Sequence, residues 1–250
     1  MKIAVCTNHV PDTATKVMIG EDGKTIEPKD VTYVVNPYDE YAIEEALKTK
    51  EQFGDDSSVV AISLGTDANK ESIKKALAMG VDSGVLLKDE SQRDSLSVAK
   101  ALAEEIKAQD TKLVFFGKQS VDYDNGAVGQ MTAEILGYNC VTVAVDFKLD
   151  GDKITAEREI EGGTEIVETS LPCIITAQKG LNEPRYASLK GIMQAKRKTI
   201  EEKDAVSADN TTEVLQMKKP AAKAPGKIVG EGPEAVPELI RLLKEEAKVI

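Results

Sequence analysis

The residues best suited to chemistry lie in a glycine- and aspartate-rich stretch, residues 117–130. The stretch follows an apolar run and precedes a helical pattern, so its glycines would let the backbone approach a ligand closely. The unpaired N–H groups at the start of the following helix would attract an anion, and Lys118 would add a positive charge. A phosphate or pyrophosphate is the group that such a loop would bind. Because Asp122 and Asp124 would repel phosphate, we expect them to cap the helix or to bind a hydroxyl group.

Spacing alone does not give this loop a function. It matches neither the Walker sequence nor the dinucleotide fingerprint of a Rossmann turn. A glycine-rich loop between a strand and a helix is structural about as often as it binds a ligand. Both interpretations therefore stay open at the level of the motif.

Composition argues against several classes of function. The chain has one histidine, His9, and no nucleophile motif beside it, so a hydrolase is not indicated. The formal net charge of -11 argues against nucleic acid as a partner, since phosphate binding needs a basic face. Cys6, Cys140 and Cys173 lie far apart in apolar runs, which suits neither disulfides nor a metal site. We expect all three to be buried, reduced thiols.

The elements that position the loop alternate between strand-like and helix-like patterns over the first half of the chain. Apolar runs predict strands at residues 2–7, 59–64, 84–87 and 112–116. Helical spacing of apolar residues predicts helices after Asn36, after Asp67, around residues 96–106 and before Gly137. The segment Asn36-Pro37-Tyr38-Asp39 has the composition of a helix start, with Asn36 as the N-cap. This alternation predicts an α/β fold with a doubly wound, mostly parallel sheet.

The pattern changes after residue 140. Four strand-like runs, residues 141–147, 153–160, 165–169 and 173–176, follow one another without long helices between them. We interpret them as antiparallel strands that extend the sheet. Residues 201–217 are polar and irregular, residues 218–225 form a stiff linker containing prolines, and residues 237–250 form an amphipathic helix. This terminal arm would either dock on another chain or pack back on its own domain.

Three segments together resemble the β subunits of electron transfer flavoproteins. They are Asn36-Pro37-Tyr38-Asp39, the block from Gly117-Lys118-Gln119 to Gly129-Gln130-Met131-Thr132-Ala133, and residues 182–189 (Asn-Glu-Pro-Arg-Tyr-Ala-Ser-Leu). Their order, their spacing and the chain length agree with the family, and the resemblance covers residues 1 to about 200. It implies an adenine nucleotide hydrolase-like fold. It also implies two parts, a nucleotide-binding domain over residues 1–200 and an arm over residues 201–250 that docks on a partner subunit.

The resemblance also implies ligands. In this family an α subunit holds most of the redox FAD, and the β subunit binds AMP or, in electron-bifurcating members, a second FAD. The motifs carry the AMP site over to this chain at Cys6, Asn36, Pro37, Tyr38, Asp39, Leu64, Gly117, Lys118, Gln119, Ser120, Val121, Asp122, Tyr123, Asp124, Asn125, Gly126, Ala127 and Val128. Tyr123 stands where bifurcating members have a glycine, which favours AMP, whereas residues 10–14 resemble the bifurcating pattern.

A second family site lies in residues 182–196, the recognition loop that inserts a leucine into a dehydrogenase partner. The residues implied to bind that partner are Arg185, Tyr186, Leu189, Ile192 and Met193. An exposed apolar anchor among basic residues would give affinity and steer the encounter. The alternative is that Leu189 is a core residue beside a solvated basic helix.

The function implied is electron carriage rather than bond chemistry, which fits the lack of a convincing acid–base pair. Flavin dehydrogenases such as acyl-CoA dehydrogenases would reduce the FAD of the α subunit, which would pass electrons to a membrane quinone oxidoreductase. An ATP-pyrophosphatase is disfavoured because residues 7–12 contain no glycine, and a stress-type nucleotide-binding module would be shorter. The apolar runs are too short to cross a bilayer and no leader precedes the first strand. We therefore expect a bacterial cytoplasmic protein, or a mitochondrial matrix protein if the source is eukaryotic.

Overall fold

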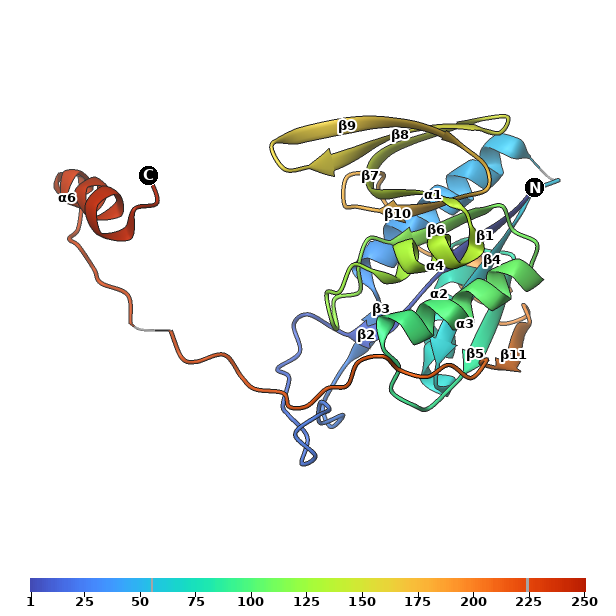
Figure 1. Cartoon of the computed structure of the whole chain (residues 1–250), viewed down its shortest axis with the longest axis horizontal. Helices are drawn as coiled ribbons and strands as arrows, with labels where there is room; N and C mark the ends of the chain where they lie inside the picture. The colour runs from blue at the N-terminus through green and yellow to red at the C-terminus, as the bar shows by residue number, and fades with distance from the viewer. Residues whose placement is uncertain (55, 224) are drawn as a thin grey trace. The chain divides into compact units, whose positions relative to one another are not determined.

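The computed structural model describes residues 1–54, 56–223 and 225–250, which form two units, Met1–Leu215 and Gln216–Ile250. The first unit contains a nine-stranded sheet with the order β11-β5-β4-β1-β6-β10-β7-β8-β9 (Figure 1). The strands are β1 (Lys2–Cys6), β4 (Ser58–Gly65), β5 (Ser83–Lys88), β6 (Leu113–Gly117), β7 (Asn139–Asp150), β8 (Lys153–Ile160), β9 (Gly163–Ser170), β10 (Cys173–Ala177) and β11 (Ile200–Asp204). All pairs from β11 to β7 are parallel, and β7, β8 and β9 pair antiparallel.

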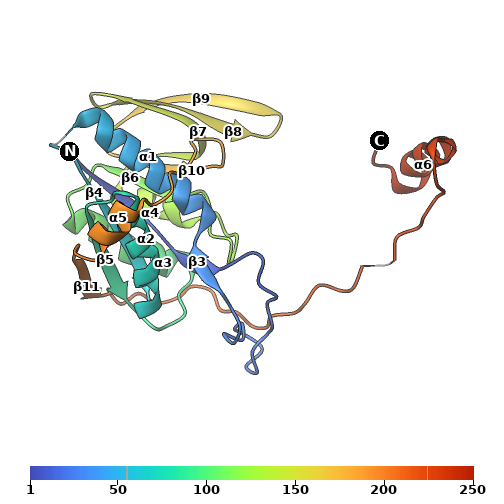
Figure 2. The same ribbon diagram turned by 180° about the vertical axis from the view of Figure 1, so that it is seen from behind.

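Helices cover both faces of the parallel part. The helices α1 (Pro37–Phe53), α2 (Lys70–Met79) and α5 (Leu189–Ala195) lie on one face, and α3 (Ser95–Ala108) and α4 (Val128–Leu136) lie on the other (Figures 1 and 2). The alternation of β1 explains this arrangement, because Ile3 and Val5 pack into the α1 and α2 layer while Ala4 and Cys6 pack into the α3 and α4 layer. The predicted doubly wound sheet with an antiparallel extension is confirmed.

Two short strands and a short helix complete the first unit. The strands β2 (His9–Pro11) and β3 (Tyr33–Val35) form a separate antiparallel pair directly after β1 and before α1. The 3₁₀ helix η1 (Asp67–Asn69) leads into α2. The second unit contains η2 (Pro233–Ala235), α6 (Val236–Leu242) and η3 (Leu243–Ala247).

The structure corrects the prediction for residues 173–176. We expected an antiparallel strand, but β10 lies between β6 and β7 and pairs in parallel with both. Every residue of β10 is buried, as is typical of a parallel strand covered by helices on two sides. The position in the chain, next to true antiparallel hairpins, was misleading.

Two further predictions need correction. Residues 200–204, expected to be irregular from position 201 onward, form the edge strand β11 beside β5. Cys6 and Cys173 are buried as expected, but Cys140 is exposed near the start of β7. All three cysteines are free thiols.

Candidate nucleotide site and docking loop

A cleft of about 940 Å³ lies at the carboxyl ends of β1, β4 and β6. Ligands in open α/β sheets bind at this edge, where loops and helix N-termini converge. One side of the cleft is apolar and includes Cys6, Leu64 and Phe116, and the other side is the polar loop after β6. Most of the predicted cofactor residues line the cleft, namely Cys6, Asp39, Leu64, Gly117, Lys118, Gln119, Ser120, Asp122, Tyr123, Asn125, Gly126, Ala127 and Val128.

Five predicted cofactor residues do not line the cleft but lie behind or beside it: Asn36, Pro37, Tyr38, Val121 and Asp124. Asn36 is buried and supports the loop from below. Its Nδ2 donates to the carbonyl oxygen of Gln119 at 2.9 Å, and its Oδ1 accepts from the amide of Val121 at 3.2 Å. Asn36 occupies the N-cap position of α1 as predicted, yet its side chain makes no capping bond to the helix. The amide group is used instead to hold residues 119–121.

Asp39 joins three segments beneath the same loop. Its carboxylate accepts hydrogen bonds from the amide of Asn8 at 2.7 Å, the amide of Gly117 at 3.2 Å and the Nδ2 of Asn36 at 2.8 Å. Burial raises the pKa of Asp39 from 3.8 to about 7, because desolvation of the charged form outweighs the three donors, and nearby Asp122 raises it further.

The close approach of Asp39 and Tyr38 explains the glycine at position 117. A Cβ atom there would collide with the carboxylate of Asp39 and would lie 2.7 Å from the Cβ of Tyr38. No other residue type would leave the loop in this position without a shift of α1. The first glycine of the motif is therefore needed for packing, whether or not it contacts a ligand.

The features expected of an anion site are present at the start of α4. Ala127 occupies the N-cap position, and no side chain of the described residues caps the helix. Its first N–H groups are thus free of a side-chain acceptor at the edge of the cleft. The ammonium group of Lys118, another lining residue, lies 5.1 Å from the centre of the Tyr38 ring.

The prediction that Asp122 and Asp124 cap the helix was wrong. Asp122 accepts from the amide of Tyr123 and from the Nδ2 of Asn8, and Asp124 accepts from the Nε2 of Gln119 at 2.7 Å. Asp124 therefore stabilises the loop internally, Asp122 also connects it to Asn8 after β1, and neither caps the start of α4. Whether either binds a ligand hydroxyl stays a prediction.

Three groups of lining residues were missed by the sequence analysis: Thr7 and Asn8 after β1, the start of α3 at residues 92–96, and residues 210–214. The Oγ1 of Thr7 is buried and has no hydrogen-bond partner among the described residues, so it could serve a ligand. Asp94 caps α3 by accepting from the amide of Ser97 at 2.8 Å, and its second oxygen accepts from the amide and hydroxyl of Thr211. A segment 117 residues distant in sequence thereby forms one wall of the cleft.

The predicted partner-binding residues lie together on another face, around the start of α5. Tyr186 is 98% exposed, Leu189 is 84% exposed, and Ile192 and Met193 are also exposed. The alternative that Leu189 is a core residue is therefore wrong. Arg185 differs from these four, since it is only one-third exposed and pairs with two glutamates of α1.

Two further searches concern metals and membranes. Across residues 1–54, 56–223 and 225–250, no three His, Cys, Asp or Glu side chains gather closely enough to hold a metal ion. Within the same described residues, none of the helices has both the length and the apolar character required for a bilayer span.

Comparisons with known proteins identify the family. A model of the electron transfer flavoprotein domain matches residues 24–208. Over its full length the chain is 38% identical to the electron transfer flavoprotein subunit beta of Bacillus subtilis and 36% identical to that of Homo sapiens, covering 100% and 99% of those proteins. It is also 37% identical to the mitochondrial electron transfer flavoprotein subunit beta of Arabidopsis thaliana, covering all of it. The resemblance seen in the sequence is thus confirmed, and the chain belongs to the family of electron transfer flavoprotein β subunits.

Proposed function

We propose that this β subunit binds AMP in the cleft and docks electron-donating dehydrogenases through its exposed loop, while an α subunit in the same heterodimer carries the redox FAD. The observation that carries the nucleotide assignment is the cleft itself. It combines an apolar wall, the unpartnered hydroxyl of Thr7 and the uncapped start of α4 at the carboxyl edge of the sheet.

These features fit the parts of an adenine nucleotide. The apolar wall, which includes Cys6, Leu64 and Phe116, would hold the base, and the backbone of residues 126–129 with Lys118 would hold the phosphate. AMP in this position is a structural ligand, so this chain has no catalytic residue and works as a carrier subunit rather than as an enzyme. The redox chemistry belongs to the FAD of the partner subunit.

A second FAD is the alternative ligand, and one observation favours it. A volume of about 940 Å³ is more than a mononucleotide fills and leaves room for a dinucleotide. Against it, Tyr123 lies in the lining of the cleft at the position where bifurcating relatives are expected to have glycine. We favour AMP because a bulky Tyr123 at this position would leave less room for an extended pyrophosphate than a glycine would.

The donors we propose are flavin dehydrogenases, with acyl-CoA dehydrogenases as the first class to test. The exposed patch of Tyr186, Leu189, Ile192 and Met193 suits an apolar pocket on a donor, and Lys190, Lys196 and Arg197 beside it would steer an acidic partner surface. A membrane quinone oxidoreductase would then accept the electrons from the heterodimer. The three free cysteines are consistent with a reducing compartment. We propose the bacterial cytoplasm, or the mitochondrial matrix if the source is eukaryotic; the plant relative is named as mitochondrial.

The composition of the heterodimer tests this proposal. The chain is co-expressed with its flavin-carrying partner, the complex is denatured, and the released nucleotides are identified and quantified by chromatography. We expect one FAD and one AMP for each heterodimer. Two FAD would move the protein to the bifurcating branch. Release of ATP alone, or failure to retain a flavin-carrying partner, would overturn the proposal.

A further inference from the structure

The docking loop is the recognition loop of the sequence analysis, residues 182–196, and it has no regular structure before α5. After β10 the chain runs over α1 as residues 178–188 without helix or strand, and α5 begins at Leu189. Tyr186 and Leu189 are largely exposed, so their side chains make few contacts with the rest of the protein. The position of these side chains must therefore come from contacts made by other residues of the loop.

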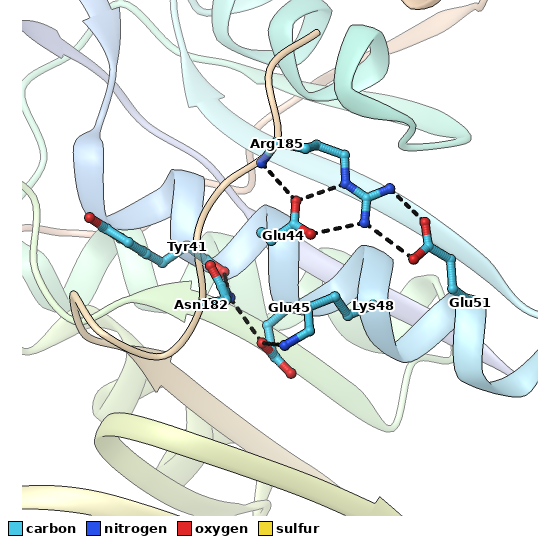
Figure 3. A network of polar contacts seen from close by, with 7 residues as sticks. All are labelled: Tyr41, Glu44, Glu45, Lys48, Glu51, Asn182 and Arg185. Carbon is cyan, nitrogen blue, oxygen red and sulfur yellow. Dashed lines mark hydrogen bonds and ion pairs between the residues drawn. The ribbon is translucent and has the colours of Figure 1, made fainter. Parts of the chain in front are cut away.

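One anchor of the loop is Arg185 (Figure 3). Its Nε and Nη2 donate to the two oxygens of Glu44 at 2.8 and 2.9 Å, and the backbone amide of Arg185 donates to Glu44 at 3.0 Å. Its Nη1 and Nη2 also donate to Glu51 at 2.5 and 3.2 Å. Glu44 and Glu51 are seven residues apart on α1, so both carboxylates lie on one face of the helix and meet the same guanidinium group.

A second anchor lies three residues earlier (Figure 3). The Nδ2 of Asn182 donates to the carbonyl oxygen of Tyr41 and to the Oε2 of Glu45, both at 2.9 Å. Lys48 pairs with the same carboxylate at 3.3 Å. The two anchors use successive turns of α1, so the segment from 182 to 185 is held along the helix.

The burial of Glu44 and the geometry of the ion pairs explain why an arginine is needed at position 185. The side chain of Glu44 is only 7% exposed, and a carboxylate at that depth needs an ionic or hydrogen-bonding partner. The hydrogen bonds from Arg185 lower the pKa of Glu51, and those to Glu44 and Glu51 raise the pKa of Arg185, so Arg185 and Glu51 stay charged over the physiological range. A lysine could not reproduce the planar fork that meets both glutamates.

The other side of the loop is fixed by α5. The hydroxyl of Ser188 caps this helix by accepting from the amide of Gly191 at 3.0 Å. Gly191 lies against the backbone of Ala78 in α2 so closely that a side chain would collide with it. The loop residues 186–188 are therefore held between the α1 anchors and the contact of α5 with α2.

From these contacts we propose that Arg185 acts inside the molecule, as a positioning residue that clamps the docking loop to α1 through Glu44 and Glu51. It holds Tyr186 and Leu189 in the conformation that a donor binds and makes no direct contact with the donor. The inference rests on the proposed docking function and replaces the sequence-based role of Arg185 as a contact residue. Loss of the clamp would lower the fraction of loops that are ready to bind, which raises the apparent dissociation constant by the same factor.

The test uses the complete heterodimer and a reduced acyl-CoA dehydrogenase as the donor probe. Arg185→Ala, Arg185→Lys and Glu44→Gln are compared with the wild-type complex for KM and kcat with respect to the donor. We expect each variant to raise KM about fivefold, with kcat at saturating donor changed by less than about twofold. Hydrogen exchange of the amides in residues 182–191 should become faster, whereas reduction of the bound FAD by dithionite should be unchanged.

Glu44→Gln separates a clamp from a direct contact, because Glu44 is buried and would not reach a donor. In the double variant Arg185→Ala/Glu44→Gln the increase in KM should be no larger than in either single variant. If Arg185 instead contacted the donor, Glu44→Gln would leave KM unchanged or lower it while Arg185→Ala raised it. That result would overturn the clamp.

A matched control lies on the opposite face of the sheet. Lys203 is one-third exposed and pairs with the buried Glu105 of α3 at 2.9 Å, so Lys203→Ala removes a similar ion pair on the side away from α1 and should leave KM for the donor unchanged. Leu189→Ala reports on the docking surface itself. A normal KM in the clamp variants with a raised KM in Leu189→Ala would overturn the clamp alone. A normal KM in Leu189→Ala as well would overturn the proposed docking function.

Discussion

Asp39 connects the loops after β1 and β6 to the start of α1 with one carboxyl group. Its pKa of about 7 means that this group changes charge near neutral pH. Because the folded protein keeps the proton to a higher pH than the unfolded chain, the stability that Asp39 contributes is fully present below pH 3.8. That stability is lost as the pH rises through about 7, and the effect is up to about 4 kcal/mol for a shift of this size.

We predict that Asp39→Asn removes the loss of stability that the wild-type protein shows as the pH rises through about 7. The free energy of unfolding of the variant, relative to the wild-type protein, should increase as the pH is raised from about 5 to about 8. Denaturant unfolding of both proteins at several pH values measures the difference. Asp124→Asn, an exposed change in the loop that Asp39 supports, serves as the matched control. A relative stability of Asp39→Asn that falls with rising pH would contradict the raised pKa.

Individual residues of the site were predictable where a local motif marks them. Gly117, Lys118 and Asn36 stand in recognisable strand–loop–helix surroundings, and all three belong to the site or support it. Asn8, Asp94 and Thr211 carry no local signal, because their roles arise from contacts between segments that are distant in the chain. The role of Asn36 was only half predictable, since a helix-start motif does not show that the amide bonds to residues 119 and 121.

At the scale of elements, Asp94 both caps α3 and binds the segment near residue 211. One oxygen caps α3, and the other accepts bonds from Thr211 and Thr212. These bonds, led by that from the amide of Ser97, hold the pKa of Asp94 well below its usual range. The start of α3 and the segment near residue 211 are thus fixed by the same side chain.

We predict that Asp94→Ala destabilises the protein by about 1–2 kcal/mol and frees the segment near residue 211. Denaturant unfolding measures the first effect, and limited proteolysis of the native protein around residues 206–214 measures the second. Thr66→Ala removes a cap without a second contact, since among the described residues the hydroxyl of Thr66 accepts only from the amide of Ala68, and it should leave residues 206–214 protected. Protection of residues 206–214 in Asp94→Ala would show that Asp94 is not their main anchor.

Elements were predictable where their own pattern was decisive. The buried apolar run of β4 and the apolar stripe of α2 each predict their element from the local sequence, and both predictions were confirmed. The edge strand β11 was missed because Ile200–Asp204 is mostly charged and exposed, and its regular hydrogen bonds come from its neighbour β5. The direction of β10 could not be read from residues 173–177 alone, since a buried strand looks the same in either orientation.

For the whole molecule, the division at Leu215 separates a unit with a large core from one without. In the second unit α6 exposes Val236, Leu239 and Ile240, and Leu242 is its buried apolar residue among those described. An amphipathic helix with so little covering of its own suits a role in binding another chain. The second unit begins at Gln216, and the docking of the predicted arm, residues 201–250, on the α subunit stays a proposal.

We predict that truncation after Leu215 leaves the first unit folded but weakens its hold on the α subunit. The unfolding temperature of the isolated first unit should stay within about 3 °C of that of the isolated full-length chain, because the sheet and both helix layers are intact. Co-purification with the α subunit should fall sharply. Leu239→Asp in the full chain should weaken co-purification in the same way, and retention of the partner by both variants would exclude a docking role for the arm.

The place of β10 in the sheet also sets a condition on how the chain can fold. β6 and β7 both precede β10 in sequence, yet they do not pair with each other. β6 pairs with β1 on its other side, whereas β7 joins the parallel strands only through β10. A nascent chain that ends before residue 173 therefore has β6 as an open edge, and the hairpins of β7, β8 and β9 have no parallel strand on which to assemble. The gap between β6 and β7 can therefore close only after residues 173–177 have been synthesised.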